Sequence, residues 1–255
     1  MNLGIIGCGA IGTDVAKVAD TLKEIENIYL LDIDERKATS LKKILKKAVV
    51  KPFNEFIKKV DVIFEAASQK AVEDYAEKIL QNGIDLVIMS IGSLFDDKFL
   101  LKLENTARIQ GCKIYLPSGA VCGIDGVLSA SIDTIDEVTL VTTKPPRSLD
   151  KNYDKRKVIF EGNAREAVKK FPKNINVAAS LSLAGVGFDN TNVKIVVDPV
   201  ATRINHKILA HGKFGRLRAE VENMPNPNNP KSSYMASLSA IATLKRIINP
   251  IQIGA

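Results

Sequence analysis

The sequence predicts an α/β fold in which a doubly wound parallel sheet is followed by a second, α+β domain. Up to Pro117, short apolar runs alternate with amphipathic helical segments, which is typical of parallel strands covered by helices on both faces. From Gly123 onward, strands follow one another with fewer helices between them, which indicates a mixed or antiparallel sheet with helices on one face. We expect domains at 1–122 and 123–231, with a terminal helix in 232–255 packing back on the first domain.

The beginning of the first domain is defined by a glycine-rich turn between a strand and a helix. The apolar run 3–6 leads directly into Gly7-x-Gly9-x-x-Gly12, and a helical pattern follows. Gly7 allows a tight turn, Gly9 lets the backbone approach a pyrophosphate, and Gly12 lets helix and strand pack closely. Free amides at the start of the helix attract the anion. This order predicts a dinucleotide-binding (Rossmann) site contacted by Gly7, Gly9, Ala10, Ile11 and Gly12.

An acidic residue follows the second predicted strand, at 28–31. Asp32 stands where a carboxylate accepts hydrogen bonds from the adenosine ribose, which favours a nicotinamide dinucleotide over a flavin. Asp32 would repel a 2′-phosphate and so favours NAD, while Arg36 and Lys37 keep NADP open. The alternative is a βαβ unit with an ordinary glycine turn and a solvated aspartate.

The remaining elements of the first domain follow from periodicity and from helix end signals. Ser68 is a candidate N-cap and Gly111 a helix stop. We expect helices at 35–45, 53–58, 68–81 and 96–110, and strands at 48–50, 60–65, 85–89 and 113–116.

Ligands of such a sheet bind outside the carboxyl ends of its strands. Three small or polar segments stand there, at 65–68, 90–93 and 118–120. They add Ala66, Ala67, Ser90 and Ala120 to the cofactor-binding candidates, although ordinary turns use the same residue types.

In the second domain, we expect an Asn-Pro-rich breaker at 226–230 and loops at 144–147 and 211–215. Helices are expected at 126–132, 164–171, 174–184 and 232–248, and strands at 137–143, 158–160, 193–197, 203–210 and 216–221.

Composition and charge argue against several classes of protein. The net charge of +7 comes from lysines dispersed along the chain, with no concentrated patch, so nucleic-acid binding is not expected. No apolar run approaches the ~20 residues that span a bilayer, and the N-terminal apolar stretch is a strand and not a signal peptide. Three widely spaced cysteines indicate neither a disulfide framework nor a metal site. We expect a cytoplasmic protein with no membrane partner.

Of the two histidines, His206 is the better candidate for chemistry. Alternation along the strand 203–210 places His206 on the apolar face with Ile204 and Ile208, and Asn205 on the other face. A histidine there is either a satisfied core residue or a general acid or base at a cleft wall, and the pattern leaves both open. His211 adjoins a glycine turn, which favours a surface role.

Several short motifs occur in series along nearly the whole chain: Gly7-x-Gly9-x-x-Gly12, Pro117-Ser118-Gly119-Ala120, Gly123-Ile124-Asp125, Lys144-Pro145-Pro146, Asn174-x-Asn176-Val177-Ala178-Ala179, Asp198-Pro199, Asn205-His206, Gly212-x-Phe214-Gly215 and Asn229-Pro230-Lys231-Ser232-Ser233. This series resembles the L-aspartate dehydrogenase family, although Cys122 stands where that family commonly has a glycine.

The resemblance implies NAD(P)-dependent oxidation of L-aspartate to iminoaspartate, and the reverse reductive amination of oxaloacetate with ammonia. Iminoaspartate feeds quinolinate and hence pyridine nucleotide synthesis. The resemblance also implies that His206 is the active-site residue, that Ala120 and Asn176 contact the dinucleotide, and that the protein is a homodimer with contacts through the second domain.

A dicarboxylate substrate needs cations or well-aimed donors. Lys231, inside its matched motif, is the first candidate, and Arg147 and Arg203 are others; Asn205 is a further substrate-binding candidate. Two other functions stay open: a nicotinamide-binding sensor without turnover, and a related oxidoreductase such as a homoserine dehydrogenase or dihydrodipicolinate reductase.

Overall fold

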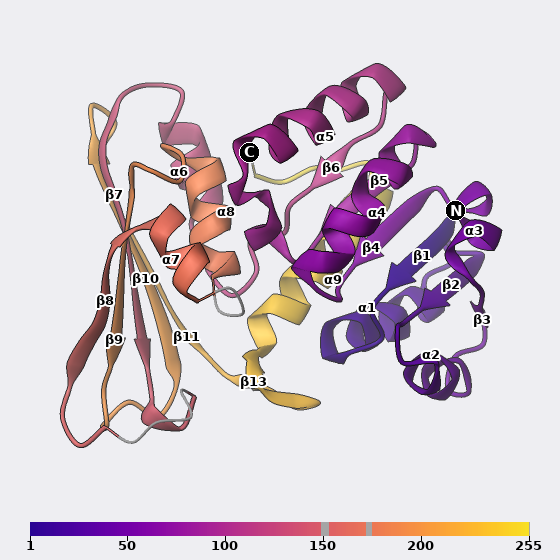
Figure 1. Ribbon diagram of the computed structural model, residues 1–255, viewed down its shortest axis with the longest axis horizontal. Coiled ribbons are helices and arrows are strands. Elements are labelled where there is room, and N and C mark those ends of the chain that lie inside the picture. The colour runs from indigo at the N-terminus through magenta and orange to yellow at the C-terminus, as the bar shows by residue number, and fades with distance from the viewer. Residues whose placement is uncertain (149–152, 172–174, 255) are drawn as a thin grey trace. The chain divides into compact units, whose positions relative to one another are not determined.

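The chain begins with the predicted strand, glycine turn and helix, which start a six-stranded parallel sheet in the order β3-β2-β1-β4-β5-β6 (Figure 1). The computed structural model describes residues 1–148, 153–171 and 175–254. The elements are β1 (Asn2–Ile6), α1 (Ala10–Thr21), β2 (Asn27–Leu31), α2 (Glu35–Lys42), β3 (Ala48–Val50), α3 (Phe53–Phe56), β4 (Val62–Glu65), α4 (Gln69–Gln81), β5 (Asp85–Ile88), α5 (Asp97–Gln110) and β6 (Ile114–Tyr115), with short 3-10 helices at Ile57–Lys59 and Ile91–Phe95. This strand order is that of a doubly wound dinucleotide fold.

Both faces of this sheet are buried because its strands are apolar on both sides. Leu3, Ile5 and Phe64 belong to one buried cluster with residues of α1. On the other face, Ile6 and Leu86 line a narrow space with Val72 of α4. Helices therefore cover both faces of the sheet, as the continuous apolar pattern of its strands predicts.

The helix ends follow the predicted capping chemistry. The Ser68 hydroxyl accepts a hydrogen bond from Ala71 N at 3.2 Å, and Asp96 accepts one from Phe99 N at 2.9 Å. Gly111 ends α5 in the left-handed region with φ 70°. These caps stabilise the helix ends that the sequence signals.

The last helix, α9 (Tyr234–Ile248), belongs mostly to the first unit. Ala240 and Leu244 have no exposed surface and lie in the same cluster as Leu3 and Val15. The chain divides into Met1–Pro117 with Ser237–Ile251, and Ser118–Ala236 with the residues from Gln252 onward. Residues 118–122 belong to the second unit, in which the Ala120 carbonyl accepts a hydrogen bond from Asn223 at 3.0 Å.

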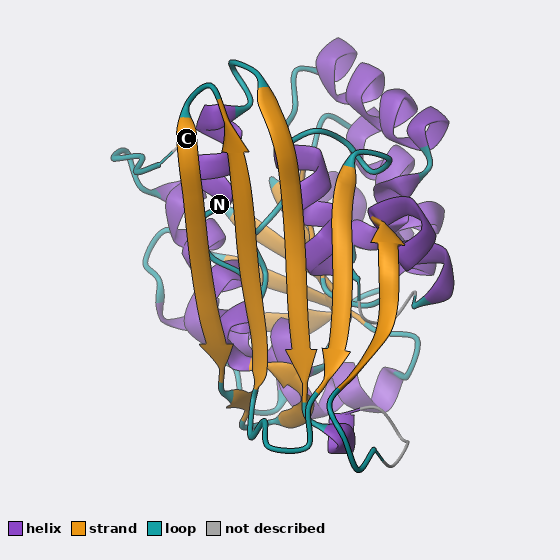
Figure 2. Cartoon of the chain, turned by 90° about the vertical axis from the view of Figure 1, so that its left-hand side faces the viewer, coloured by secondary structure: helices purple, strands orange, loops and turns teal. Residues whose placement is uncertain are grey.

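The second unit contains a five-stranded sheet in the order β11-β10-β7-β9-β8. Its elements are α6 (Ile124–Ala130), β7 (Ile135–Lys144), a 3-10 turn (Pro146–Ser148), β8 (Lys157–Asn163), α7 (Ala164–Lys170), α8 (Asn176–Ala184), β9 (Thr191–Val197), β10 (Ile204–Gly212), β11 (Gly215–Asn223), β12 (Pro225–Asn226) and β13 (Asn229–Ser233). Strands β7 and β9 run parallel and the other neighbours antiparallel, so the sheet is mixed. Helices α6, α7 and α8 cover one face, and Figure 2 shows the other face without helices.

Two expectations for the second unit are corrected. Strands β10 and β11 are joined by a two-residue turn at Lys213 and Phe214, not by a five-residue loop, because pairing extends to Gly212 and Gly215. The Asn-Pro-rich breaker contains the turn of a small hairpin, β12–β13, because Asn226 pairs with Asn229. The start of the predicted helix 174–184 lies partly outside the described residues.

Within the described residues, no helix is both long and apolar enough to cross a membrane. Among those same residues, no group of three or more histidine, cysteine, aspartate or glutamate side chains is placed to hold a metal ion.

Candidate functional site

The glycine turn of the first unit has the shape that a dinucleotide requires. Gly7 has φ 100°, and a Cβ there would stand 2.6 Å from the Ala66 carbonyl oxygen. A Cβ on Gly12 would overlap the Gly7 carbonyl oxygen, whereas a Cβ on Gly9 would meet nothing within 4 Å. Gly7 and Gly12 are therefore required by the fold, and Gly9 faces open space that a bound group can use.

The start of α1 is suited to an anion. Gly9 is its N-cap and gives no side-chain cap, and the first turn, which includes Ala10 and Ile11, has no acidic residue. The amides of the first turn and the helix dipole thus remain available for a pyrophosphate. The residues present fit a dinucleotide.

Asp32 connects the end of β2 to the glycine turn. Its Oδ2 accepts a hydrogen bond from Cys8 N at 2.7 Å, and its Oδ1 accepts one from Asp34 N at 2.8 Å. Each carboxylate oxygen has a second lone pair, so Asp32 can also accept from a ribose hydroxyl while it holds the turn in place.

A buried carboxylate organises the loops after β4 and β5. Glu65 is 2% exposed, and its Oε1 accepts hydrogen bonds from Ala67 N at 2.8 Å and Ser68 N at 2.9 Å. Ser90 donates both its amide, to Oε2 at 3.0 Å, and its hydroxyl, to Oε1 at 2.8 Å. Burial raises the pKa of Glu65, and these donors oppose that shift. Glu65 thereby fixes the segments that carry the candidates Ala66, Ala67 and Ser90.

The other two cofactor candidates lie in the second unit. Ala120 is buried, and its carbonyl accepts a hydrogen bond from the Asn223 amide. The Oδ1 atom of Asn223 is itself buried and has no hydrogen-bond partner among the residues that the structure describes. Asn176 is the exposed first residue of α8, and its carbonyl accepts a hydrogen bond from Ser180 Oγ at 3.0 Å.

His206 lies on the covered face of the second sheet, as alternation along β10 predicts. It is 7% exposed, and its Nδ1 lies 2.9 Å from Thr142 Oγ1 on the neighbouring strand β7. Burial, with a smaller contribution from the charge of Lys144, lowers the pKa of His206 to about 3. The imidazole is therefore neutral at any physiological pH.

Lys144 is a buried lysine near His206 to which the sequence analysis gives no role. It is 5% exposed at the end of β7, and burial lowers its pKa to about 8. Among the described residues its ammonium has neither a hydrogen bond nor an ion pair. The signal for it was present in the sequence, because alternation places Lys144 on the same face of β7 as Leu140 and Thr142.

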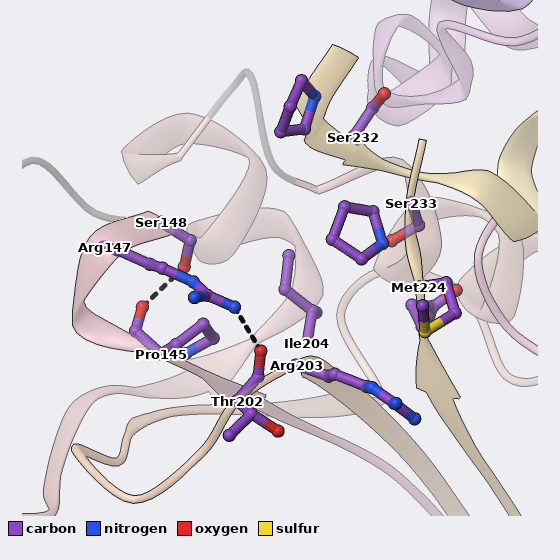
Figure 3. Close-up of a pocket in the computed structure, with 12 residues that line it drawn as sticks. Pro145, Arg147, Ser148, Thr202, Arg203, Ile204, Met224, Ser232 and Ser233 are labelled. Carbon is purple, nitrogen blue, oxygen red and sulfur yellow. Dashed lines mark hydrogen bonds between the residues drawn. The ribbon is translucent and has the colours of Figure 1, made fainter. Parts of the chain in front are cut away.

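A cavity of about 390 Å³ lies within the second unit, and neither Lys144 nor His206 is among the residues that line it (Figure 3). It reaches the residue after Lys144, Pro145, and also includes Ile204, two positions before His206 on β10. Its cations are Arg147, which donates a hydrogen bond to the Thr202 carbonyl, and Arg203. Ser232 and Ser233 of β13 add hydroxyl groups, so the cavity can offer several donors to a carboxylate.

The remaining candidates are placed as follows. Asn205 lies on the opposite face of β10 from His206, and its amide donates to Glu220 Oε1 at 3.1 Å. The structure therefore does not bring Asn205 and His206 together. Lys231 is a residue of β13, but its side chain lies outside what the structure describes. His211 is exposed, 3.2 Å from Glu137.

Comparison with known proteins adds a family relation. Residues 125–247 match the family model described as aspartate dehydrogenase, C-terminal, and residues 7–117 match the homoserine dehydrogenase, NAD binding domain. The L-aspartate dehydrogenases of Methanosarcina acetivorans and Methanococcoides burtonii are each 45% identical over 269 aligned residues, covering 100% of this chain and 99% of each relative. The crystal structure of aspartate dehydrogenase from Thermotoga maritima superposes with a TM-score of 0.82 at 30% identity, covering 100% of this chain and 99% of that one.

Proposed function

The chain belongs to the L-aspartate dehydrogenase family, and we propose that it oxidises L-aspartate to iminoaspartate with NAD or NADP and catalyses the reverse amination of oxaloacetate with ammonia. The observation that carries this proposal is the buried ammonium of Lys144, which has no hydrogen bond or ion pair with any described residue, on the same sheet face as the neutral imidazole of His206. The product would supply quinolinate and pyridine nucleotide synthesis.

Proton transfer is the step that this chain's own residues must provide. The bound nicotinamide supplies the hydride acceptor at its C4 carbon, and the protein positions the substrate. The α-amine of aspartate must lose a proton before an imine forms. A group with a pKa close to the working pH performs that transfer best.

Lys144 meets this requirement better than His206, because burial lowers its pKa to about 8 whereas that of His206 falls to about 3. We therefore assign the proton transfer to Lys144. His206, held at Nδ1 by Thr142, gives a neutral hydrogen-bonding group at a fixed position. This differs from the role that the sequence analysis gives to His206.

The arginine-containing cavity supports the choice of a dicarboxylate substrate. Arg147 and Arg203 can each form two parallel hydrogen bonds with a carboxylate. We propose that one of them holds the side-chain carboxylate of aspartate. Lys231 stays a candidate for the same role, whereas the amide of Asn205 donates to Glu220 on the opposite face of β10.

Purified protein would be mixed with NADH, oxaloacetate and ammonium, with controls that lack each component. Loss of NADH absorbance that depends on ammonium supports the proposal. Loss without ammonium would instead indicate a hydroxy-acid dehydrogenase, and cofactor binding without any turnover of NADH or NADPH would favour the sensor.

Two lysine variants test in the same assay whether Lys144 takes part in the reaction. Lys144→Met should reduce kcat at least about 100-fold, the usual contribution of a general acid or base, and should retain NADH binding. Lys207→Met is the matched control, because Lys207 lies on the opposite face of β10 and pairs in register with Glu220 of β11. Equal activity of both variants would remove Lys144 from the mechanism.

A homodimer is also part of the proposal. It rests on the family resemblance and on the uncovered face of the β11-β10-β7-β9-β8 sheet (Figure 2). Light scattering of the purified chain should give twice the monomer mass of 27.8 kDa, and a monomer would contradict this part.

A further inference from the structure

Thr142 is a buried polar residue to which the proposed reaction gives no role of its own. It is 5% exposed on β7, and its Oγ1 lies 2.9 Å from Nδ1 of His206 on β10. The two residues stand directly opposite each other in the β7–β10 pairing, so their side chains leave the same face of the sheet. The partner of one ring nitrogen sets which nitrogen of a neutral imidazole carries the proton.

Two arrangements of protons fit the contact between Thr142 and His206. Either the hydroxyl donates to Nδ1 and the ring proton is on Nε2, or Nδ1 carries the proton and donates to the hydroxyl oxygen. In the second arrangement the hydroxyl proton has no acceptor, because His206 is the one hydrogen-bond partner of the Thr142 side chain among the described residues. A buried donor without an acceptor is costly, so the first arrangement is favoured.

The other ring nitrogen, Nε2 of His206, stays open to a ligand. Among the described side chains, the polar atoms that are buried without a hydrogen-bond partner are Ser182 Oγ and Asn223 Oδ1. Nε2 of His206 has no partner there either and is not one of these two atoms, so it retains solvent-accessible surface. The same holds for the ammonium of Lys144, whose charge acts on His206. A ligand can therefore reach both nitrogens.

We propose that Thr142 is a positioning residue that fixes the tautomer of His206, so that Nε2–H donates a hydrogen bond to an oxygen of the substrate. This inference rests on the proposed function and specifies how His206 takes part in it. The oxygen that needs a donor is the keto oxygen of oxaloacetate, which gains negative charge as ammonia adds. Nε2–H and the ammonium of Lys144 are two donors that suit this oxygen.

The amination step assigns separate tasks to His206 and Lys144. The lone pair of ammonia forms the C–N bond, and the electron pair of the C=O bond moves onto the oxygen. Two protons of ammonia end on that oxygen, which leaves as water, and an imine remains. Lys144 relays these protons, whereas Nε2–H of His206 donates a hydrogen bond and keeps its own proton.

The tautomer can be measured by nitrogen NMR, because the whole chain has two histidines. Histidine labelled with ¹⁵N in the ring gives few signals, and His211→Gln identifies those of His206. At pH 7 we expect a protonated Nε2 and, well downfield of it, an Nδ1 with a free lone pair. Thr142→Val removes the hydroxyl at the same shape and should move the two signals toward each other, because both tautomers are then populated. Thr142→Ser restores the hydroxyl and should keep the wild-type pattern.

Steady-state amination with the same variants tests whether the tautomer matters for the reaction. Thr142→Val should lower kcat/KM for oxaloacetate about tenfold, the effect of one weakened hydrogen bond, and should leave NADH affinity within about twofold. Thr142→Ser should stay within about twofold of the wild type in both. Thr143→Val is the matched control, because Thr143 lies on the opposite face of β7 and pairs in register with Asn205. It should change neither the signals nor the turnover.

Three results would overturn the inference. The first is a wild-type His206 with its proton on Nδ1, and the second is a Thr142→Val variant that keeps the wild-type signals, whatever its activity. The third is wild-type turnover in Thr142→Val despite altered signals, which would show that Nε2–H does not serve the substrate. A tautomer that depends on Thr142, in a wild-type chain that does not aminate oxaloacetate, would instead overturn the proposed function.

Discussion

At the scale of single residues, the proposed proton-transfer group Lys144 costs stability. The ammonium of Lys144 is buried without a partner among the described residues, and its pKa falls from 10.5 to about 8. Each unit of this shift corresponds to about 1.4 kcal/mol, so the charged form costs the folded state about 3 kcal/mol. This cost is present in full below pH 8, and it declines as pH rises toward 10.5, where the unfolded chain also loses its proton.

Lys144→Met should therefore stabilise the protein at pH 7 by about 2 to 3 kcal/mol, because an apolar side chain of similar length replaces a buried charge. At pH 10 the gain should shrink to about 1 kcal/mol or less. Chemical unfolding of both proteins at the two pH values measures this difference, with Lys207→Met as the control for a more exposed lysine. A variant that is less stable at pH 7 would show that Lys144 has a favourable partner in the fold.

At the scale of secondary structure elements, different glycines of the β1–turn–α1 segment are required for folding and for cofactor binding. Gly12 is required because any Cβ there would overlap the Gly7 carbonyl oxygen. Gly9 has nothing within 4 Å of a Cβ position and a normal negative φ of −75°. The fold itself therefore tolerates a side chain at Gly9, and the cofactor would not.

Gly9→Ala should keep the thermal stability of the wild type within a few degrees and lose at least about tenfold in NADH affinity, because its methyl group occupies the space of the pyrophosphate. Gly12→Ala should destabilise the chain by several kcal/mol, since backbone atoms and not a flexible side chain must move. Melting curves and NADH titrations on both variants test this contrast. Equal melting temperatures for the two would contradict it.

At the scale of the whole molecule, the buried neutral His206 makes the fold sensitive to acid. Burial lowers its pKa in the folded chain to about 3, from the 6.5 of a histidine in water. Below pH 6.5 the unfolded chain binds a proton that the folded chain does not, so stability falls as pH falls from 6.5 toward 3.

His206→Gln should remove this part of the acid sensitivity. Between pH 7 and pH 4.5, the wild type should lose about 2 to 3 kcal/mol more unfolding free energy than the variant, because pH 4.5 lies about two units below the pKa of a histidine in the unfolded chain. Urea unfolding of both proteins at the two pH values measures this difference in unfolding free energy. His211→Gln is the matched control, because His211 is exposed beside Glu137. If that variant showed a similarly reduced loss of unfolding free energy between pH 7 and pH 4.5, the burial of His206 would not be the cause of the acid sensitivity.

Much of this architecture could be predicted because it depends on residues that are close in sequence. Periodicity located the strands and helices of the first unit, and Ser68 and Gly111 set helix ends through local hydrogen bonds and backbone conformation. Alternation placed His206 on the covered face of its strand. The hairpin β12–β13 was missed because its Asn-Pro residues indicate a turn but not the pairing on either side of it.

The amino-acid sequence alone is enough to predict the doubly wound sheet, the glycine turn with its acidic partner Asp32, and the family resemblance. Which groups can exchange a proton depends instead on how the chain packs in three dimensions. Burial lowers the pKa of both Lys144 and His206, and the charge of Lys144 lowers that of His206 further, although the two residues are far apart along the chain. The same holds for the Glu65 carboxylate, which Ser90 of another loop helps to hold. Desolvation and charge act through space, so no local pattern of residues encodes them.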